Sequence, residues 1–334
     1  MNAKQIKKVV ILGATGSLGK QSIEVLEKYK KHFQVIGISA NTNEKLLNFQ
    51  AKKLGLKKTQ ALLVSKSGKK KLLSMAALKE ADIIINVLAG TSGIEPSQEA
   101  LKAGKTLLLG NKESLISEGI KLLKFHGKIV PIDSEHNAIF EIIRKFPKKK
   151  IEKIIIPCSG GPFWNRNKSQ IEKITAKDIM KHPKWDLGKK ILVESATLIN
   201  KGFEIIEAYY LFMLPLKKIE TMIHPQCMVH GIVKFTDGEN FAYVSKPDMR
   251  EHIENALTFA AGIKSPKREI RKLKKDEYKF ENPNHEVLQG INIVLKTFQQ
   301  NPYKMKSFLE KEEKVIKKFL QGKMKLTEIF TACL

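Results

Sequence analysis

Two carboxylates, Asp133 and Glu135, directly follow an apolar stretch that reads as a strand. If the extended conformation continues past Ile132, both side chains point to the same face, because alternate residues of a strand share a face. Two carboxylates on one face repel each other unless a cation or a proton lies between them. Hard divalent ions such as Mg²⁺ and Mn²⁺ prefer such oxygen ligands. An isolated pair is more often an ordinary acidic loop.

A third carboxylate, Glu204, lies on a helix that the sequence predicts from about Ala196 to Leu214. Asn200 and Lys201 precede it by four and three residues, so the three side chains share one helical face. This group adds weight to a metal and anion site formed with the first two carboxylates. The simpler alternative is a solvated helix face with a Lys–Glu pair.

Two loop segments carry further polar groups. Ser159, Gly160 and Gly161 offer a hydroxyl and backbone N–H groups that could cradle a phosphate. His182 and Trp185 place an imidazole and an indole in a polar segment that we expect to be a mobile loop. A single histidine or tryptophan is more often structural.

A glycine-rich turn, GATGSLG over residues 13–19, lies between a predicted strand and a predicted helix at the start of the chain. Glycines at this place let the backbone approach a pyrophosphate, and the helix N-terminus supplies free N–H groups. The position in a βα series favours a dinucleotide over an empty tight turn. The second strand ends in Ala40, Asn41 and Thr42, with no carboxylate before Glu44. NAD enzymes usually place an acid there, so the small polar residues favour NADP.

The elements around these residues predict an α/β protein. Strand-like stretches alternate with helical ones, which indicates a parallel sheet; they cover residues 8–12, 34–39, 61–65, 82–87, 106–109 and 128–132. A further strand is expected at 153–157, and a hairpin joins 228–235 to 240–245. We predict an N-terminal Rossmann-like NADP-binding domain at 1–132 and a central α+β catalytic domain at 133–264. A linker at 265–284 then leads to a small C-terminal helical domain at 285–334.

Composition limits the alternatives. The chain has 334 residues, a formal net charge of +26 and 60 basic residues, of which five are arginine. Arginine is the usual reader of bases, and the lysines are spread along the chain, so a solvated surface explains the charge better than nucleic acid. Three cysteines fit a reducing compartment, and no signal segment or membrane span is evident.

Taken together, these segments resemble the 1-deoxy-D-xylulose 5-phosphate reductoisomerase family. The resemblance extends over roughly the first 250 residues. It rests on GATGSLG and on further blocks: GNKESL (110–115), PIDSEHNAIF (131–140), SGGPF (159–163), HPKWDLGKKILVESATLINKGFE (182–204), IHPQCMVHG (223–231), DGE (237–239) and KPDM (246–249).

The resemblance assigns roles to residues. Those expected to bind NADPH are Thr15, Gly16, Ser17, Leu18, Ala40, Asn41, Thr42, Asn111, Glu113 and Gly188. The expected ligands of Mg²⁺ or Mn²⁺, with Co²⁺ as a further candidate, are Asp133, Glu135 and Glu204. The expected substrate contacts are Lys112, Ser134, Glu135, Ser159, His182, Ser195, Asn200, Lys201 and Glu204. The residues expected to be catalytic are Lys112, Asp133, Glu135, His182 and Glu204, with Trp185 on a lid.

The implied reaction rearranges the skeleton of 1-deoxy-D-xylulose 5-phosphate by retro-aldol cleavage and re-addition. NADPH then reduces the resulting aldehyde to 2-C-methyl-D-erythritol 4-phosphate, a step of non-mevalonate isoprenoid synthesis. The resemblance also implies a homodimer that acts on a phosphorylated sugar. From the composition we expect a cytoplasmic protein with neither nucleic acid nor membrane as a partner.

Some positions depart from the family pattern. Leu187 replaces the usual Met of the lid, Cys227 stands where Ser is usual, and Cys158 precedes Ser159. The last part of the chain is short and lacks the usual Asn-Ala-Ala-Asn-Glu stretch.

Two other functions compete with this one. A semialdehyde dehydrogenase would use Cys158 or Cys227 as a thiolate nucleophile and would need no metal. A basic nucleic-acid-binding protein that kept a Rossmann domain would show salt-dependent binding. Neither alternative explains the three carboxylates.

Overall fold

The computed structural model describes residues 6–179, 188–284 and 289–333. The chain forms two compact units. The first unit contains the chain up to Ser114 together with Ile120–Asn137 and Asp248–Lys267. The second unit contains Leu115–Gly119, Ala138–Pro247 and the chain from Arg268 onward. The predicted division into an NADP-binding domain, a catalytic domain, a linker and a C-terminal domain, with boundaries at residues 132, 264 and 284, stays a prediction.

In the described part of the first unit, six strands form one parallel sheet in the order β3-β2-β1-β4-β5-β6. Their bounds are β1 (Lys7–Leu12), β2 (Phe33–Ala40), β3 (Ala61–Leu63), β4 (Ile83–Asn86), β5 (Thr106–Leu109) and β6 (Lys128–Pro131). Residues 9–12 and 83–85 are apolar and buried. Continuous apolar runs are typical of strands covered by helices on both faces. The strand order is that of a Rossmann fold.

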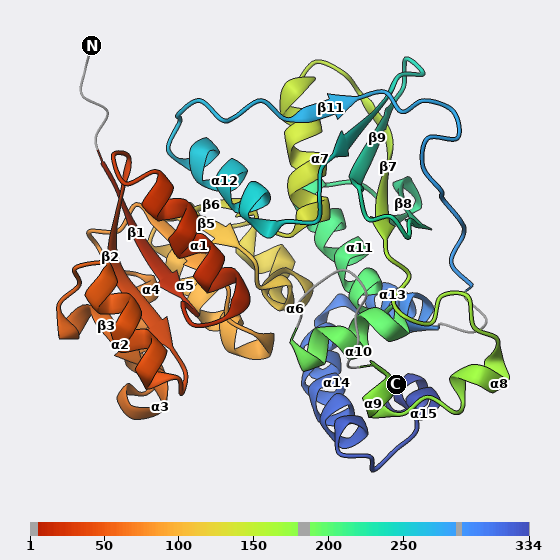
Figure 1. Ribbon diagram of the computed structural model, residues 1–334, viewed down its shortest axis with the longest axis horizontal. Coiled ribbons are helices and arrows are strands. Elements are labelled where there is room, and N and C mark those ends of the chain that lie inside the picture. The colour runs from red at the N-terminus through yellow and green to blue at the C-terminus, as the bar shows by residue number, and fades with distance from the viewer. Residues whose placement is uncertain (1–5, 180–187, 285–288, 334) are drawn as a thin grey trace. The chain divides into compact units, whose positions relative to one another are not determined.

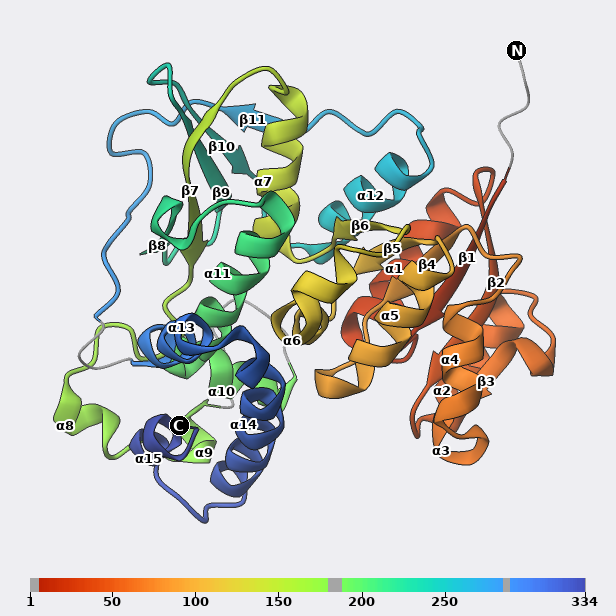
Figure 2. The same cartoon turned by 180° about the vertical axis from the view of Figure 1, so that it is seen from behind.

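Helices cover both faces of this sheet, as Figures 1 and 2 show. Helix α12 lies beside α1 on one face, and α4 lies beside α5 on the other. The helices of this unit are α1 (Ser17–Lys28), α2 (Glu44–Lys53), α3 (Val64–Ser67), α4 (Lys69–Ala76), α5 (Ile94–Lys102) and α12 (Met249–Ala260). Helix α6 (Lys112–Leu122) begins and ends in the first unit, but its middle, Leu115–Gly119, belongs to the second. Helix α7 (Ser134–Lys145) begins in the first unit and ends in the second.

A second sheet forms the core of the second unit, with the order β11-β10-β9-β7-β8 among the described strands. Its bounds are β7 (Ile151–Cys158), β8 (Ile219–Ile223), β9 (Val229–Phe235), β10 (Asn240–Val244) and β11 (Glu269–Arg271). Strand β7 pairs in parallel with β8 and antiparallel with β9. One face buries Ile155, Val229 and Ile232 with their neighbours.

The remaining helices of the second unit pack on one another. Helix α11 contacts α13, and α14 contacts both α10 and α15. Their bounds are α8 (Lys168–Ile171), α9 (Ala176–Ile179), α10 (Lys189–Thr197), α11 (Ile199–Phe212), α13 (Gly290–Gln300), α14 (Met305–Leu320) and α15 (Leu326–Ala332). Short 3₁₀ turns lie at Lys58–Gln60, Gly90–Gly93, Leu216–Lys218 and Pro302–Lys304.

The predicted α/β class is confirmed, but two local predictions are wrong. The single helix expected over 196–214 is two helices, because Leu198 adopts a left-handed conformation with φ of 59°. Gly290 packs against this break, where a Cβ would lie 2.2 Å from the carbonyl oxygen of Thr197. The extended conformation expected from Asp133 to Glu135 is also wrong, since α7 begins at Ser134.

Two short strands, β8 and β11, were not predicted. Within 6–179, 188–284 and 289–333, no helix is long and apolar enough to cross a bilayer.

Candidate active site

The glycine-rich turn joins β1 to α1 in the first unit. Gly13 has φ of +94°, and a Cβ there would lie 2.8 Å from the carbonyl oxygen of Val87. A Cβ on Gly19 would lie 2.3 Å from the carbonyl oxygen of Gly13. Side chains are thus excluded at both glycines, and the backbone turns directly into the helix N-terminus. Such a turn presents N–H groups to a pyrophosphate.

Neighbouring segments fix the conformation of the turn. The backbone N–H groups of Gly13 and Ala14 donate to the carbonyl oxygen of Ser39, at 3.1 and 2.8 Å. The buried Gln50 amide donates to the carbonyl oxygen of Ala14 at 2.9 Å. Of the predicted pyrophosphate contacts, Gly16 caps α1, Ser17 and Leu18 form its first turn, and Thr15 precedes them. The turn is therefore rigid without any charged group.

The residues expected to face an adenosine 2′-phosphate follow β2. Ala40 is buried at the end of the strand, whereas Asn41 and Thr42 are exposed. The first carboxylate after them, Glu44, pairs with Lys66 at 2.6 Å. A carboxylate already paired in this way agrees with the preference for NADP over NAD.

Asn111 and Glu113, expected beside the nicotinamide, belong to a buried network in the first unit. The Asn111 amide donates to the carbonyl oxygens of Leu88 and Gly90, at 2.9 and 2.8 Å, and to Glu113 Oε2 at 3.0 Å. Its Oδ1 accepts the Ser114 hydroxyl at 2.5 Å. The carbonyl oxygens of Leu88 and Gly90 thereby each gain a donor, which ties the loop after β4 to Asn111.

Asp133 lies in the first unit beside Lys112, and their charged atoms are 2.7 Å apart. Burial alone would raise the pKa of the Asp133 carboxyl, but the charges of Lys112 and His136 outweigh it and hold that pKa far below its usual value. Ser134 donates to Glu135 Oε2 at 2.5 Å in the first turn of α7. An ionised carboxylate with oxygen neighbours fits a hard divalent ion.

The loop expected to hold phosphate lies in the second unit. Gly160 and Gly161 have φ of 83° and 68°, and the N–H of Gly161 donates to Ser159 Oγ at 3.1 Å. A Cβ on Gly161 would lie 2.7 Å from the carbonyl oxygen of Ser195. The loop and the C-terminal end of α10 are therefore in close contact, which brings Ser159 and Ser195 to one place.

Glu204 is buried on α11 and is held by its own helix. Asn200 donates to Glu204 Oε1, and Lys201 pairs with Glu204 Oε2. Lys201 is only 3% exposed and also donates to the carbonyl oxygen of Pro157, at 2.8 Å. The shared helical face predicted from the spacing is confirmed, and the alternative of a solvated face is wrong.

The sequence did not reveal a buried acidic pair beside Ser195. Glu194 and Glu312 are 3% and 0% exposed, and Lys190 Nζ pairs with Glu194 and lies 3.2 Å from Glu312 Oε2. Burial, followed by the charge of Glu194, raises the pKa of Glu312 well above its usual value. Glu312 lies far along the chain on α14, so no local pattern could have paired it with α10.

Cys158 and Cys227 are the two residues on which a thiolate mechanism could depend. Burial raises the pKa of the Cys158 thiol, although the charge of Lys201 partly opposes this. A nucleophilic cysteine needs the opposite shift. Cys227 is buried with φ of 54°, and its Sγ lies 3.7 Å from the carbonyl oxygen of His224.

Three of the residues singled out in the lid segment, His182, Trp185 and Leu187, lie outside the described residues. Gly188 is described, is exposed and caps the N-terminus of α10 in the second unit.

A Rossmann sheet with a glycine turn at β1–α1, together with buried carboxylates and lysines, defines a dinucleotide-dependent oxidoreductase. The comparisons identify the family. Residues 9–119 match the family profile described as 1-deoxy-D-xylulose 5-phosphate reductoisomerase, and residues 129–212 match that of the enzyme's C-terminal domain. The chain belongs to this family.

Individual relatives support the assignment. The reductoisomerase of Thermodesulfovibrio yellowstonii is 37% identical, over 97% of this chain and 90% of the relative. That of Halothermothrix orenii is also 37% identical, over 88% and 82%. The similarity thus reaches well beyond the first 250 residues.

Solved structures give the same result. The Zymomonas mobilis reductoisomerase in complex with NADPH is 30% identical with a TM-score of 0.83, over 98% of this chain and 90% of that one. A DOX-P reductoisomerase in complex with NADPH, fosmidomycin and magnesium is 27% identical with a TM-score of 0.85, over 98% and 89%. The predicted family, fold class and enzyme class are confirmed, and the dehydrogenase alternative is wrong.

Proposed function

We propose that this chain uses NADPH and a divalent metal ion to convert 1-deoxy-D-xylulose 5-phosphate to 2-C-methyl-D-erythritol 4-phosphate. The observation that supports this most strongly is the burial of Glu204 between Asn200 and Lys201 on α11. Charged groups are rarely buried unless they are paired or functional. Membership of the reductoisomerase family suggests a role for this buried carboxylate, that of a metal ligand.

Asp133, Glu135 and Glu204 are the proposed metal ligands, with Mg²⁺ or Mn²⁺ as the ion and Co²⁺ as a further candidate. All three offer carboxylate oxygens, and Lys112 keeps Asp133 ionised. When bound, the metal ion stabilises negative charge on substrate oxygens as a Lewis acid. Lys112, whose Nζ lies 2.7 Å from Asp133 Oδ2, is the proposed group for balancing charge and donating a proton to a substrate oxygen.

The proposed phosphate anchor comprises Ser159, Ser195, Asn200 and Lys201, closed by His182. Close contact of the Ser159 loop with α10 and the buried ammonium of Lys201 support this role. Binding energy from the non-reacting phosphate then helps to orient the reacting carbons. Trp185 is proposed to lie on a lid that excludes water.

The proposed NADPH contacts are the glycine turn, residues 40–42, Asn111, Glu113 and Gly188. The turn fits a pyrophosphate because a Cβ is excluded at Gly13 and Gly19. The exposed Asn41 and Thr42 offer uncharged donors to a 2′-phosphate.

We also propose a cytoplasmic homodimer. Three free cysteines in the described residues suit a reducing compartment. Light scattering of the purified chain measures the oligomeric state directly, and a monomer would contradict this part of the proposal.

The decisive experiment follows NADPH absorbance with 1-deoxy-D-xylulose 5-phosphate and Mg²⁺ or Mn²⁺, then with EDTA. We expect oxidation that requires both substrate and metal. Glu204→Gln should lower turnover by at least about 10²-fold, since one oriented polar group at a reacting centre contributes that much, while NADPH affinity persists. Glu220→Gln, at a partly exposed carboxylate of the same unit, is the control. Near-normal metal-dependent rates in Glu204→Gln would remove Glu204 from the ligand set.

A further inference from the structure

A buried polar network joins the start of α7 to α12 within the first unit. Asn137, His252 and Asn255 are all fully buried. The Asn255 amide donates to Asn137 Oδ1 at 2.9 Å, and His252 Nδ1 lies 3.2 Å from the same oxygen. The Asn137 amide in turn donates to the carbonyl oxygen of Pro131 at 3.0 Å. These contacts use both ends of the Asn137 side chain.

Asn137 closes the turn that contains two of the proposed metal ligands. Its backbone N–H donates to the carbonyl oxygen of Asp133 at 2.8 Å, and its side chain reaches Pro131 at the end of β6. The other end of the turn is fixed by the N–H of Ile132, which donates to Leu109 of β5 at 2.9 Å. The backbone that carries Asp133 and Glu135 is therefore held from both sides.

We propose that Asn137 is a positioning residue for the metal ligands, and that Asn255 and His252 of α12 hold its amide in the required orientation. This inference rests on the proposed function, because it takes Asp133 and Glu135 to be ligands. Partners that orient metal ligands from behind typically change metal affinity 10- to 100-fold when they are removed. Asn255 is 118 residues from Asn137 along the chain, so sequence proximity offers no hint of this role.

The chemistry of the network suits this task. Neutral amides fix direction through paired donors and acceptors. They add no charge that would compete with the metal ion for the carboxylates. A further polar side chain of α12, Thr258, is equally buried, but its hydroxyl bonds to the backbone carbonyl oxygens of Glu254 and Asn255 on its own helix and to the Ser265 hydroxyl, not to the Asn255 amide group. Thr258 therefore provides a matched control on the same helix.

The experiment measures Mn²⁺ binding to the full chain by electron paramagnetic resonance of free Mn²⁺, without substrate. We expect Asn255→Leu to weaken Mn²⁺ binding roughly 10-fold or more and to leave the Kd for NADPH within about twofold. Thr258→Val should keep wild-type Mn²⁺ affinity even where its Tm falls. If Asn255→Leu does not fold, Asn255→Ala takes its place in the same comparison.

Two results would overturn the inference: wild-type Mn²⁺ affinity in the Asn255 variant, or an equal loss in Thr258→Val. Asp133→Asn separates this failure from failure of the proposed function. If Asp133→Asn loses Mn²⁺ while the Asn255 variant keeps it, only the positioning role is wrong. If Asp133→Asn binds Mn²⁺ like the wild type, the proposed ligand set and the positioning role both fall.

Discussion

The glycine-rich turn, proposed to bind NADPH, and the α10–α11 region, proposed to bind phosphate and metal, are built from different kinds of groups. The glycine-rich turn relies on backbone groups and on a neutral amide, that of Gln50, which donates to the carbonyl oxygen of Ala14. The α10–α11 region buries charged side chains instead, among them Lys201 and Glu204. A neutral network tolerates changes of pH, whereas a buried charge becomes costly once its partner is lost. Substitutions and pH should therefore affect the two regions differently.

The largest effect is expected at Lys201, because its ammonium group belongs to the proposed phosphate anchor and also pairs with the buried Glu204 carboxylate. Lys201→Ala removes a charge from the proposed phosphate anchor and leaves Glu204 without its buried cationic partner, with only the neutral Asn200 amide still donating to it. We expect the KM for the phosphorylated substrate to rise roughly 10²-fold, with a loss of about 3–5 kcal/mol in unfolding free energy. Steady-state kinetics and urea unfolding measure the two. Lys153→Ala, at a partly exposed ion pair, is the control. An equal rise in the KM for NADPH would move Lys201 out of the anchor.

The neutral turn should respond to shape rather than charge. In Gly19→Ala the new Cβ meets backbone at 2.3 and 2.6 Å, which no side-chain rotation can relieve. We expect NADPH affinity to fall roughly 10- to 10²-fold, because displacement of about 1 Å at a site can cost this much. Gly37→Ala on β2, with contacts no closer than 3.5 Å, is the matched control. Titration of NADPH fluorescence measures both, and a Gly19 variant that binds like the control would contradict the assignment.

The buried acidic pair should make the second unit sensitive to pH. The folded-state pKa of Glu312 is raised, so the folded protein holds a proton that the unfolded chain releases above about pH 4.3. Stability from this group is therefore complete below that pH and is lost as pH rises towards the folded-state pKa.

Glu312→Gln mimics the protonated acid. Between pH 5 and 8, the unfolding free energy of the variant should therefore fall by roughly 1–3 kcal/mol less than that of the wild type. Urea unfolding at several pH values tests this, with Glu310→Gln on the same helix as control. Parallel pH profiles for wild type and Glu312→Gln would show that Glu312 does not titrate in this range.

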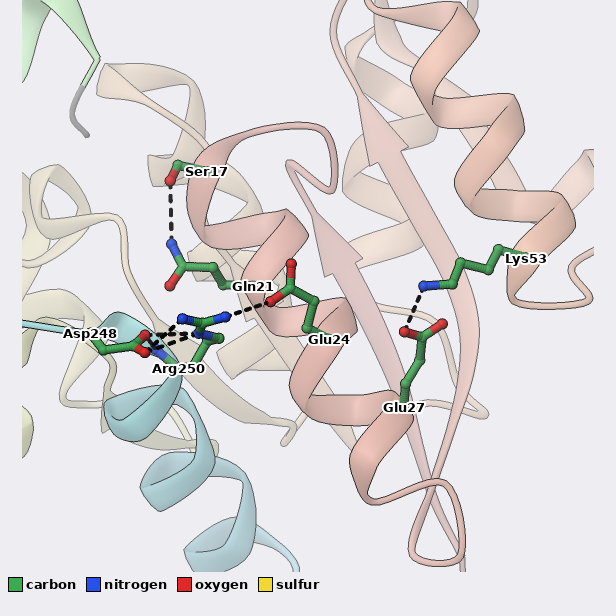
Figure 3. Close-up of polar contacts among 7 residues, drawn as sticks. All are labelled: Ser17, Gln21, Glu24, Glu27, Lys53, Asp248 and Arg250. Carbon is green, nitrogen blue, oxygen red and sulfur yellow. Dashed lines mark hydrogen bonds and ion pairs between the residues drawn. The ribbon is translucent and has the colours of Figure 1, made fainter. Parts of the chain in front are cut away.

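The smallest effect is expected on the exposed side of α1, which Figure 3 shows. Arg250 pairs with Glu24 at 3.3 Å and with Asp248 at 2.8 Å, and Lys53 pairs with Glu27 at 2.7 Å. Exposed ion pairs contribute little because water and salt screen them. Arg250→Ala and Lys53→Ala should each shift Tm by at most about 2 °C. A much larger shift in Arg250→Ala alone would mean that this contact is coupled to the buried face of α12.

The sequence predicted those features that local patterns encode. The strands of the first sheet, the glycine turn and the shared face of Asn200, Lys201 and Glu204 all follow from periodicity and residue type. The break at Leu198 could not be predicted, because leucine rarely adopts positive φ and because Gly290, which packs against the break, lies far along the chain.

Contacts between distant segments were equally hidden. Glu312 meets Lys190 from another helix, and Asn255 reaches Asn137 across 118 residues. Strands β8 and β11 have only five and three residues, and their pairing comes from neighbouring strands rather than from their own pattern.

The discontinuity of the first unit has a consequence for synthesis on the ribosome. Its last stretch, Asp248–Lys267, includes α12, which covers α1 and supplies Asn255. A nascent chain that has emerged only as far as Asn137 contains all six strands of the sheet but not this helix. Strands β7 to β10 leave the ribosome before α12 does, so the sheet of the second unit can begin to form while the first unit is still incomplete.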